Sequence, residues 1–286
     1  MAFKSLAEIV EYSKKNSIPF WKSVLDDDCR DSGIKQEAAI KKMEYMWEVM
    51  LNTIENYNGK EFSSSGLSGG DGEKFSIYRN KSKTFCGPLV SSMIEVALKT
   101  AEANACMHRI VACPTAGSCG VLPSVLIPLF NNHLINKNQC IRAMITAAGI
   151  GKIIAMNASI SGAEGGCQAE IGSASAMAAG ALTQIKGGNP LQIITAVSFA
   201  LQNLMGLVCD PIGGLVEIPC IKRNVIGCMN AISAADLSLA GISPHIPPDE
   251  TIAALASVGK LLPDTLKETG QGGLAASPTA KRLWNL

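Results

Sequence analysis

Apolar residues recur at helical spacing through most of the chain, whereas the strict alternation of a half-buried strand is scarce. Between positions 35 and 58, six apolar residues fall on one helical face: Ala39, Met43, Met46, Trp47, Met50 and Ile54. The same spacing predicts further helices over 88–109, 137–158, 170–186, 190–208, 221–241 and 248–262. A chain with this pattern, and without strands between its helices, is predicted to adopt an all-α fold.

The residues between positions 172 and 182 are nearly all Gly, Ala or Ser, which lets neighbouring helix backbones approach closely. We therefore expect a helical bundle whose central helices are built from small residues. Residues 1–60 carry more charge and most of the Trp and Tyr. They are predicted to form an N-terminal helical segment that lies on a larger helical domain of residues 61–286.

Three glycine-rich segments interrupt the helical pattern, at 63–72, 114–120 and 162–170. We expect each to be a loop at a helix end that belongs to an active site. Glycine permits tight turns and close ligand approach, while helix N-terminal amides and Ser or Thr hydroxyls favour an anion such as a carboxylate. The alternative for each segment is an ordinary helix-breaking turn. None matches the Rossmann or phosphate-loop fingerprint, so nucleotide binding has no support.

Charge and hydropathy narrow the class of protein. The chain has 25 Lys and Arg against 24 Asp and Glu, so it lacks the basic surface that nucleic acid or an anionic membrane would require. Two uncharged runs, 110–136 and 187–209, raise a membrane-spanning bundle as an alternative. Both runs contain polar residues and lack aromatic anchors, so we expect buried helices and no membrane. The first residues show no signal-peptide pattern, which favours the cytoplasm.

Ten cysteines in a reducing compartment are free thiols, metal ligands or nucleophiles. Cys106, Cys140 and Cys228 lie among helical apolar residues, where a free cysteine usually packs as a small hydrophobe. Glycine or proline stands within two residues of the cysteines at positions 167, 209 and 220. These neighbours predict turns or helix ends, where backbone N–H groups stabilise a thiolate.

Four segments resemble the α chain of bacterial iron–sulfur-dependent L-serine dehydratase: 112–123, 153–159, 162–177 and 206–224. The resemblance implies that Cys167, Cys209 and Cys220 bind a 4Fe–4S cluster, which their spacing alone does not indicate. Three protein ligands leave one iron open, and that iron can act as a Lewis acid on the leaving hydroxyl group of L-serine. The products are then pyruvate and ammonia, and no pyridoxal phosphate (PLP) is needed.

The resemblance also implies that the glycine-rich loops hold the carboxylate of the substrate. The expected substrate-binding residues are Ser65, Gly66, Gly69, Gly70, Thr115, Gly117, Ser118 and Asn157. The general base is left unassigned, with Glu164, Asp210 and Lys152 as candidates. Glu170 and Glu217 also lie beside the expected ligands, where an acidic residue can instead accept hydrogen bonds. For Lys152 an ordinary packing or charge role is favoured over a Schiff base. His108, His133 and His245 are expected to be structural or solvated, and a group from a partner chain is an equal alternative.

Single-chain members of the family carry an upstream domain with a Ser-Ser-Ser-His-Thr stretch and, in some, a terminal cysteine that plugs the open iron. This sequence has neither, so we expect a separate β chain, a hetero-oligomer and no self-plugging. Two alternatives stay open besides the membrane bundle. One is β-elimination from threonine or cysteine, and the other is a non-catalytic iron–sulfur protein.

Overall fold

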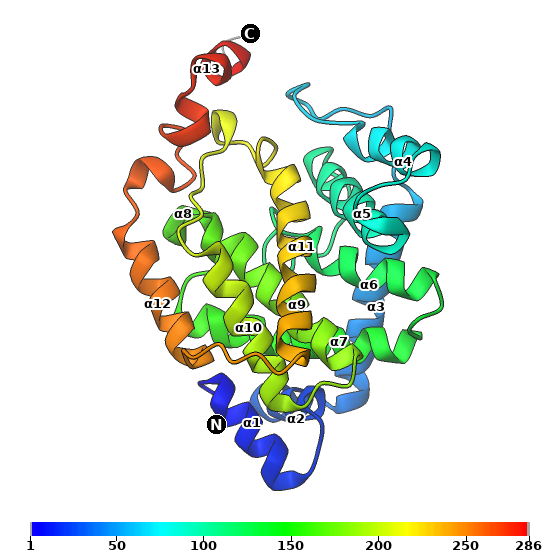
Figure 1. The fold of residues 1–286 in the computed structure, drawn as a ribbon, viewed down its shortest axis with the longest axis vertical. Coiled ribbons are helices and arrows are strands. Elements are labelled where there is room, and N and C mark those ends of the chain that lie inside the picture. Colours follow the sequence, from blue (N-terminus) through cyan, green and yellow to red (C-terminus); the bar gives the residue numbers. More distant parts are fainter. Residues whose placement is uncertain (1, 285–286) are drawn as a thin grey trace.

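The computed structural model describes residues 2–284, and over that range the protein is all-α, as predicted (Figure 1). Its single β contact there is an isolated parallel bridge between Cys209 and Lys267. The helices are α1 (Leu6–Asn16), α2 (Phe20–Ser32), α3 (Gln36–Glu55), α4 (Asp71–Lys81), α5 (Gly87–Ala105), α6 (Val121–Asn131), α7 (Lys137–Asn157), α8 (Gly162–Gly165), α9 (Ser173–Ile185), α10 (Pro190–Leu204), α11 (Cys220–Leu239), α12 (Pro248–Leu261) and α13 (Pro278–Trp284).

Helix α9 forms the centre of the bundle, and every residue from Ser173 to Thr183 is buried. It packs against α7, α10 and α11. Small residues are required here because the neighbouring helices lie close. A Cβ at Gly180, for example, would stand only 2.2 Å from Cδ1 of Ile150 on α7. The fold therefore has the central helix of small residues that the sequence predicts.

Helices α2 and α3 pack against α7, while α1 packs against α2, α10 and α12; α1 and α2 lie at the end of the molecule that carries the N-terminus (Figure 1). Leu6, Phe20 and Trp47 are almost fully buried and belong to the same apolar core as the central helices. Trp47 meets Phe130 of α6 edge to face, with the ring centroids 5.5 Å apart. The division at residue 60 into a segment and a domain stays a prediction.

Helix α7 is, within residues 2–284, the one helix long and apolar enough to cross a membrane. The bundle buries 67% of that apolar stretch, so its hydrophobicity is explained by the core that it helps to build. The two uncharged runs of the sequence, 110–136 and 187–209, do not include α7; they contain α6 and α10. Capping boxes at Asn136 and Asn189 fix the first turns of α7 and α10.

The third glycine-rich segment is more helical than expected. Residues Gly162–Gly165 form the single turn α8, and Gln168–Gly172 form a π-helical turn that runs directly into α9. Cys167 stands between these turns. A π-helical turn is often found at a functional site because its extra residue redirects the side chains. This segment, the start of α11 and the loop before α4 lie at the end of the bundle away from the N-terminus (Figure 1).

Candidate metal and substrate site

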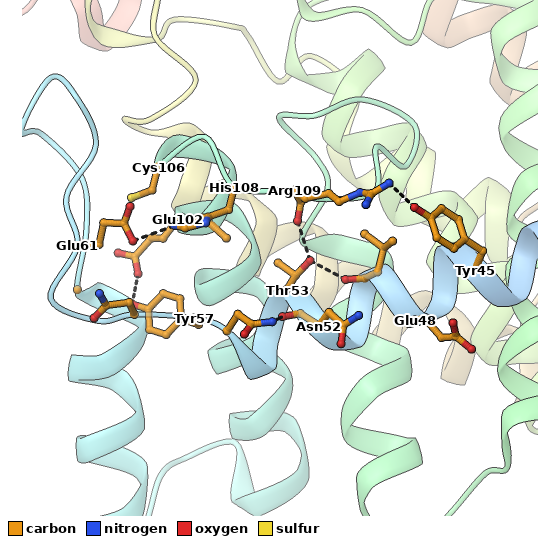
Figure 2. Close-up of a pocket in the computed structure, with 15 residues that line it drawn as sticks. Tyr45, Glu48, Asn52, Thr53, Tyr57, Glu61, Glu102, Cys106, His108 and Arg109 are labelled. Atoms are coloured by element: carbon orange, nitrogen blue, oxygen red, sulfur yellow. Dashed lines mark hydrogen bonds and ion pairs between the residues drawn. The ribbon is translucent and has the colours of Figure 1, made fainter.

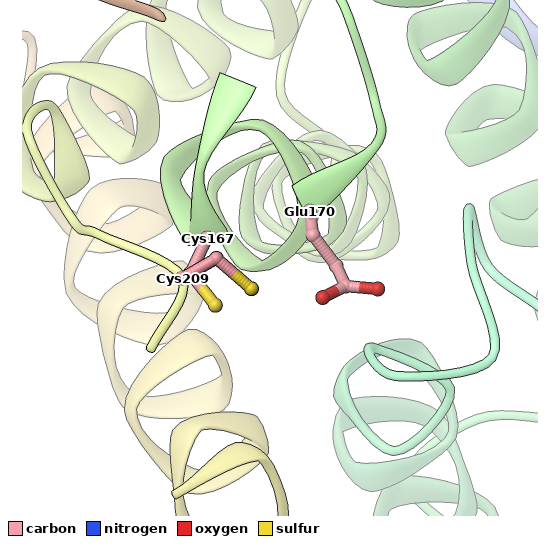
Figure 3. A group of neighbouring side chains, drawn as sticks. All are labelled: Cys167, Glu170 and Cys209. Atoms are coloured by element: carbon pink, nitrogen blue, oxygen red, sulfur yellow. The ribbon is translucent and has the colours of Figure 1, made fainter. Parts of the chain in front are cut away.

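Three buried side chains converge at this end of the bundle. One sulfur atom each from Cys167 and Cys209 and a carboxylate oxygen of Glu170 all lie within 4.8 Å of one another. Figure 3 shows Cys167 and Glu170 on one turn, while Cys209 approaches from a separate segment. The segment that carries Cys209 is held by the segment that carries Leu266, because the Cys209 N–H donates to the Leu266 carbonyl at 2.8 Å.

Cys220, the first residue of α11, lies beside this group and is 4% exposed. Burial is the main cause that raises the pKa of its thiol, and the negative charges of Cys167 and Glu170 raise it further. The structure therefore brings the three cysteines singled out in the sequence to one buried region. The tight group of sulfur and oxygen atoms contains two of them together with Glu170.

Arg223, one turn into α11, supplies the positive charge of the site. Its Nη1 donates to the Cys167 sulfur at 3.3 Å and to the Val208 carbonyl at 2.8 Å, and its Nη2 donates to Asp210 at 2.7 Å. The pKa of Cys167 is lowered, first by the hydrogen bond from the Cys209 thiol and then, against burial, by the charge of Arg223. Cys167 is therefore the thiol best prepared to act as a thiolate ligand.

Two glycines keep space open beside these groups. A Cβ on Gly162 would stand 2.9 Å from the Cys209 sulfur, and one on Gly117 would stand 2.7 Å from Oε1 of Glu170. Any side chain at either position would fill the room beside the sulfur and carboxylate atoms. Soft thiolate donors, a guanidinium that stabilises them and a cradle that a Cβ would fill together fit an iron–sulfur group.

The loop of residues 114–120 borders the site through Glu170. The Thr115 hydroxyl is hydrogen-bonded to Glu170 and lies 3.0 Å from the Ser118 hydroxyl. Asn224 of α11 clamps the loop, since it accepts from the Gly120 N–H at 2.9 Å and donates to the Gly117 carbonyl at 2.8 Å. Burial raises the pKa of Glu170, the Thr115 bond opposes that shift, and the charge of Glu268 adds to it.

The loop of residues 63–70 is tied to the segment that leads into Cys220. The hydroxyls of Ser63 and Ser65 donate to Glu217 at 2.8 and 2.9 Å. The Ser68 hydroxyl is buried and has no hydrogen-bond partner among residues 2–284. Gly69 adopts φ 140°, and a Cβ there would stand 2.3 Å from the Glu61 carbonyl, so the turn requires glycine.

A cavity of about 310 Å³ lies between α3 and the end of α5, and Gly70 of this loop is among the residues that line it (Figure 2). His108 pairs there with Glu61 at 2.8 Å. The buried carboxylate of Glu102 accepts from the N–H groups of Asp71 and Gly72 at 2.7 and 3.0 Å. Glu102 therefore fixes the start of α4 and, with it, the end of the 63–70 loop.

These features accompany a clear similarity to known proteins. Residues 14–275 match the sequence profile of the family described as serine dehydratase alpha chain. The chain belongs to this family. It is 42% identical over 281 residues to the probable L-serine dehydratase, alpha chain, of Bacillus subtilis (strain 168), which covers 98% of this chain and 94% of that protein.

Two further relatives differ in architecture. The L-serine dehydratase, alpha chain, of Peptoniphilus asaccharolyticus is 38% identical over 277 residues, which cover 96% of this chain and 95% of that protein. The L-serine dehydratase of Haemophilus influenzae is 35% identical over 96% of this chain, but the match covers only 61% of that longer protein. The family resemblance drawn from the sequence is thereby confirmed.

In this member of the serine dehydratase family, three candidates from the sequence are engaged by groups other than the three cysteines. Lys152 pairs with Asp27 and Asp31 of α2 at 3.5 and 3.2 Å. The Asn157 amide donates to the carbonyls of Lys4 and Ile153 at 2.9 and 2.8 Å. Glu164 accepts from the Ser159 hydroxyl at 2.6 Å, and Asn157 and Glu164 line a different cavity of about 360 Å³. The fourth candidate, Asp210, reaches Cys167 through Arg223.

Two charged residues of the site were not singled out in the sequence. Arg223 lies within the segment of family resemblance at 206–224, so its neighbours could have drawn attention to it. Glu268 lies outside every such segment and reaches the site because its stretch of chain pairs with Cys209. No local pattern around Glu268 indicates this long-range contact.

Proposed function

We propose that this chain is the α chain of an L-serine dehydratase, which converts L-serine to pyruvate and ammonia with a 4Fe–4S cluster bound by Cys167, Cys209 and Cys220. The observation that carries the proposal is the buried convergence of these cysteines, with Arg223 donating to one sulfur, at the glycine-rich loops. Membership of the serine dehydratase alpha chain family supports it.

When bound, a cluster with three protein thiolates supplies one open iron, a Lewis acid suited to the leaving hydroxyl group. The chain's own residues prepare the place for it. Arg223 favours the thiolate form of Cys167, while Gly117 and Gly162 leave the Glu170 carboxylate and the Cys209 sulfur uncovered by a side chain. No pyridoxal phosphate is required, and Lys152 is engaged by two aspartates.

The loops are proposed to hold the serine carboxylate. Loop 114–120 offers the hydroxyls of Thr115 and Ser118 and the backbone at Gly117, next to Glu170. Loop 63–70 offers Ser65, Gly66, Gly69 and Gly70, and Glu217 holds it in place. Hydroxyl and amide donors in a buried site bind a carboxylate strongly because little water competes. Loss of the α-proton and the hydroxyl leaves aminoacrylate, which tautomerises and hydrolyses.

A separate β chain is proposed to complete the site. The Haemophilus influenzae relative is a longer protein, and the match to this chain covers 61% of it, so the relative contains sequence outside the match. The base that takes the α-proton is proposed to come from that part or from this chain's carboxylates. A hetero-oligomer in the cytoplasm is part of the same proposal.

The test is to purify the chain without oxygen, with and without the β chain, and to measure iron, sulfide and pyruvate release from L-serine. We expect about four irons per α chain, and turnover only with both chains. L-Threonine and L-cysteine serve as competing substrates. An iron-free complex, or one that prefers another amino acid, would refute the proposal.

A further inference from the structure

The backbone at Glu268 is held against Cys209 from two sides. The Glu268 N–H donates to the Cys209 carbonyl at 2.8 Å, and the Cys209 N–H donates to Leu266 at 2.8 Å. The backbone of Glu268 adopts φ 64°, in the left-handed region that residues other than glycine rarely adopt. Such strain persists only where surrounding contacts impose it, and it often accompanies a functional site.

The carboxylate of Glu268 borders the gap that Gly162 leaves. The position of a Cβ on Gly162 is 3.3 Å from Oε2 of Glu268 and 3.5 Å from Oε2 of Glu170. The other Glu170 oxygen, Oε1, is the one bonded to Thr115. One free oxygen from each of two carboxylates, carried by separate segments, therefore faces the same small space beside the Cys209 sulfur.

Neither carboxylate forms an ion pair with a cationic side chain among residues 2–284, although the charge of Arg223 acts on Glu170. The cations nearest along the chain are engaged elsewhere, since Lys267 pairs with Asp264 at 3.7 Å and Arg223 pairs with Asp210 at 2.7 Å.

We propose that Glu268, with Glu170 opposite it, binds the α-ammonium group of the substrate and so selects amino acids over hydroxy acids. The inference rests on the proposed function. An ammonium group has three donors and no acceptor, and charge-assisted bonds to carboxylates are its strongest partners. With the substrate carboxylate on the glycine-rich loops and the ammonium group at Glu268, the zwitterion is fixed at two ends, which orients the carbon between them.

The test uses the anaerobic α–β enzyme with Glu268→Gln, which removes the charge and keeps the size. The KM for L-serine is expected to rise at least about tenfold, as for loss of a hydrogen bond to a charged group, with a smaller change in kcat. The inhibition constant of 3-hydroxypropanoate, which is serine without its amino group, is expected to stay within about twofold. Glu268→Asp, which keeps the charge, is expected to restore part of the affinity for L-serine.

The matched control is Asp264→Asn in the same segment, whose side chain is 98% exposed, and it is expected to change neither constant. Equal weakening of L-serine and 3-hydroxypropanoate by Glu268→Gln would overturn the assignment, as would an unchanged KM. Loss of iron in that variant would assign Glu268 to the metal group instead. Failure of the proposed function is separate, because the unaltered enzyme would then release no pyruvate from L-serine.

Discussion

Cys140 and Cys228 lie in the apolar core, while Cys167, Cys209 and Cys220 lie at the loop-bearing end of the same bundle. Exposure hardly separates the two groups, at 0% for the core pair and 1–4% for the other three. The residues around these cysteines do separate the two groups. Burial raises the pKa of Cys140 to about 12 and of Cys228 to about 11. At the loop-bearing end the pKa of Cys167 is lowered, first by the hydrogen bond from Cys209, whereas the pKa of Cys209 is raised by that same bond and the pKa of Cys220 by burial. The second group is therefore distinguished by the charges and hydrogen-bond donors around its thiols.

The largest difference between the two groups is expected on replacement by serine. Cys167→Ser, Cys209→Ser and Cys220→Ser should each lose most of the iron and lower activity by more than roughly 100-fold, because iron–sulfur clusters require thiolate ligands. Cys140→Ser and Cys228→Ser are the controls and should keep iron and activity. Iron and sulfide analysis measures the effect, and full iron retention in all three site variants would sink the ligand assignment.

A smaller effect is expected when the charge beside Cys167 is removed. Arg223→Met should lower cluster content or activity by roughly 10-fold to 100-fold, the range for partners of metal ligands. Arg223→Lys should lose less, because it keeps the charge but not the guanidinium fork that also bonds Val208 and Asp210. Arg142→Met removes a cation that lies over Trp21, 4.9 Å from the ring centroid, and serves as the control. Equal behaviour of the two methionine variants would remove Arg223 from the site.

The sequence predicted the core more fully than the site, because helical periodicity is a local property. The ranges 137–158 and 248–262 fall within one residue of α7 and α12, and the small-residue stretch at 172–182 corresponds to α9. The site depends instead on contacts between distant segments. Glu170 belonged to a stretch of recognised resemblance, but its approach to Cys209, and that of Glu268 to Gly162, follow from tertiary structure alone.

The loops offer a third contrast, between a glycine that the site needs and one that only forms a turn. Gly69→Val places a Cβ 2.3 Å from the Glu61 carbonyl and should raise the KM for L-serine about tenfold, or about 1.4 kcal/mol, while the cluster spectrum stays intact. Ser118→Ala should act in the same direction. Gly33→Ala is the control, because Gly33 also has a positive φ but a Cβ there meets nothing within 4 Å. Steady-state kinetics with L-serine would contradict this view of the loops if all three variants matched the unaltered enzyme.

The smallest expected effect is a loss of folding stability at alkaline pH, caused by the two core thiols Cys140 and Cys228. Burial raises the pKa values of Cys140 and Cys228 in the folded protein to about 12 and about 11, above the ordinary value of 9.0 for a cysteine thiol. A group whose pKa is raised on folding contributes its full stability below the unfolded pKa and loses it as pH rises towards the folded pKa. Each thiol should therefore cost the folded enzyme about 1.4 kcal/mol at pH 10, one pH unit above the unfolded value.

Denaturant unfolding at pH 7 and pH 10 measures this loss. Cys140→Ala and Cys228→Ala should each lose less stability than the unaltered enzyme over that interval, by about 1.4 kcal/mol. Both variants should be less stable at pH 7, by about 1 kcal/mol, because a buried sulfur is removed from a packed core. An identical pH dependence in the variants and the unaltered enzyme would mean that these two thiols ionise as easily folded as unfolded. The expected contrast is between an apolar core that keeps Cys140 and Cys228 protonated and a charged site that favours the thiolate of Cys167. It would then no longer hold for the two core cysteines.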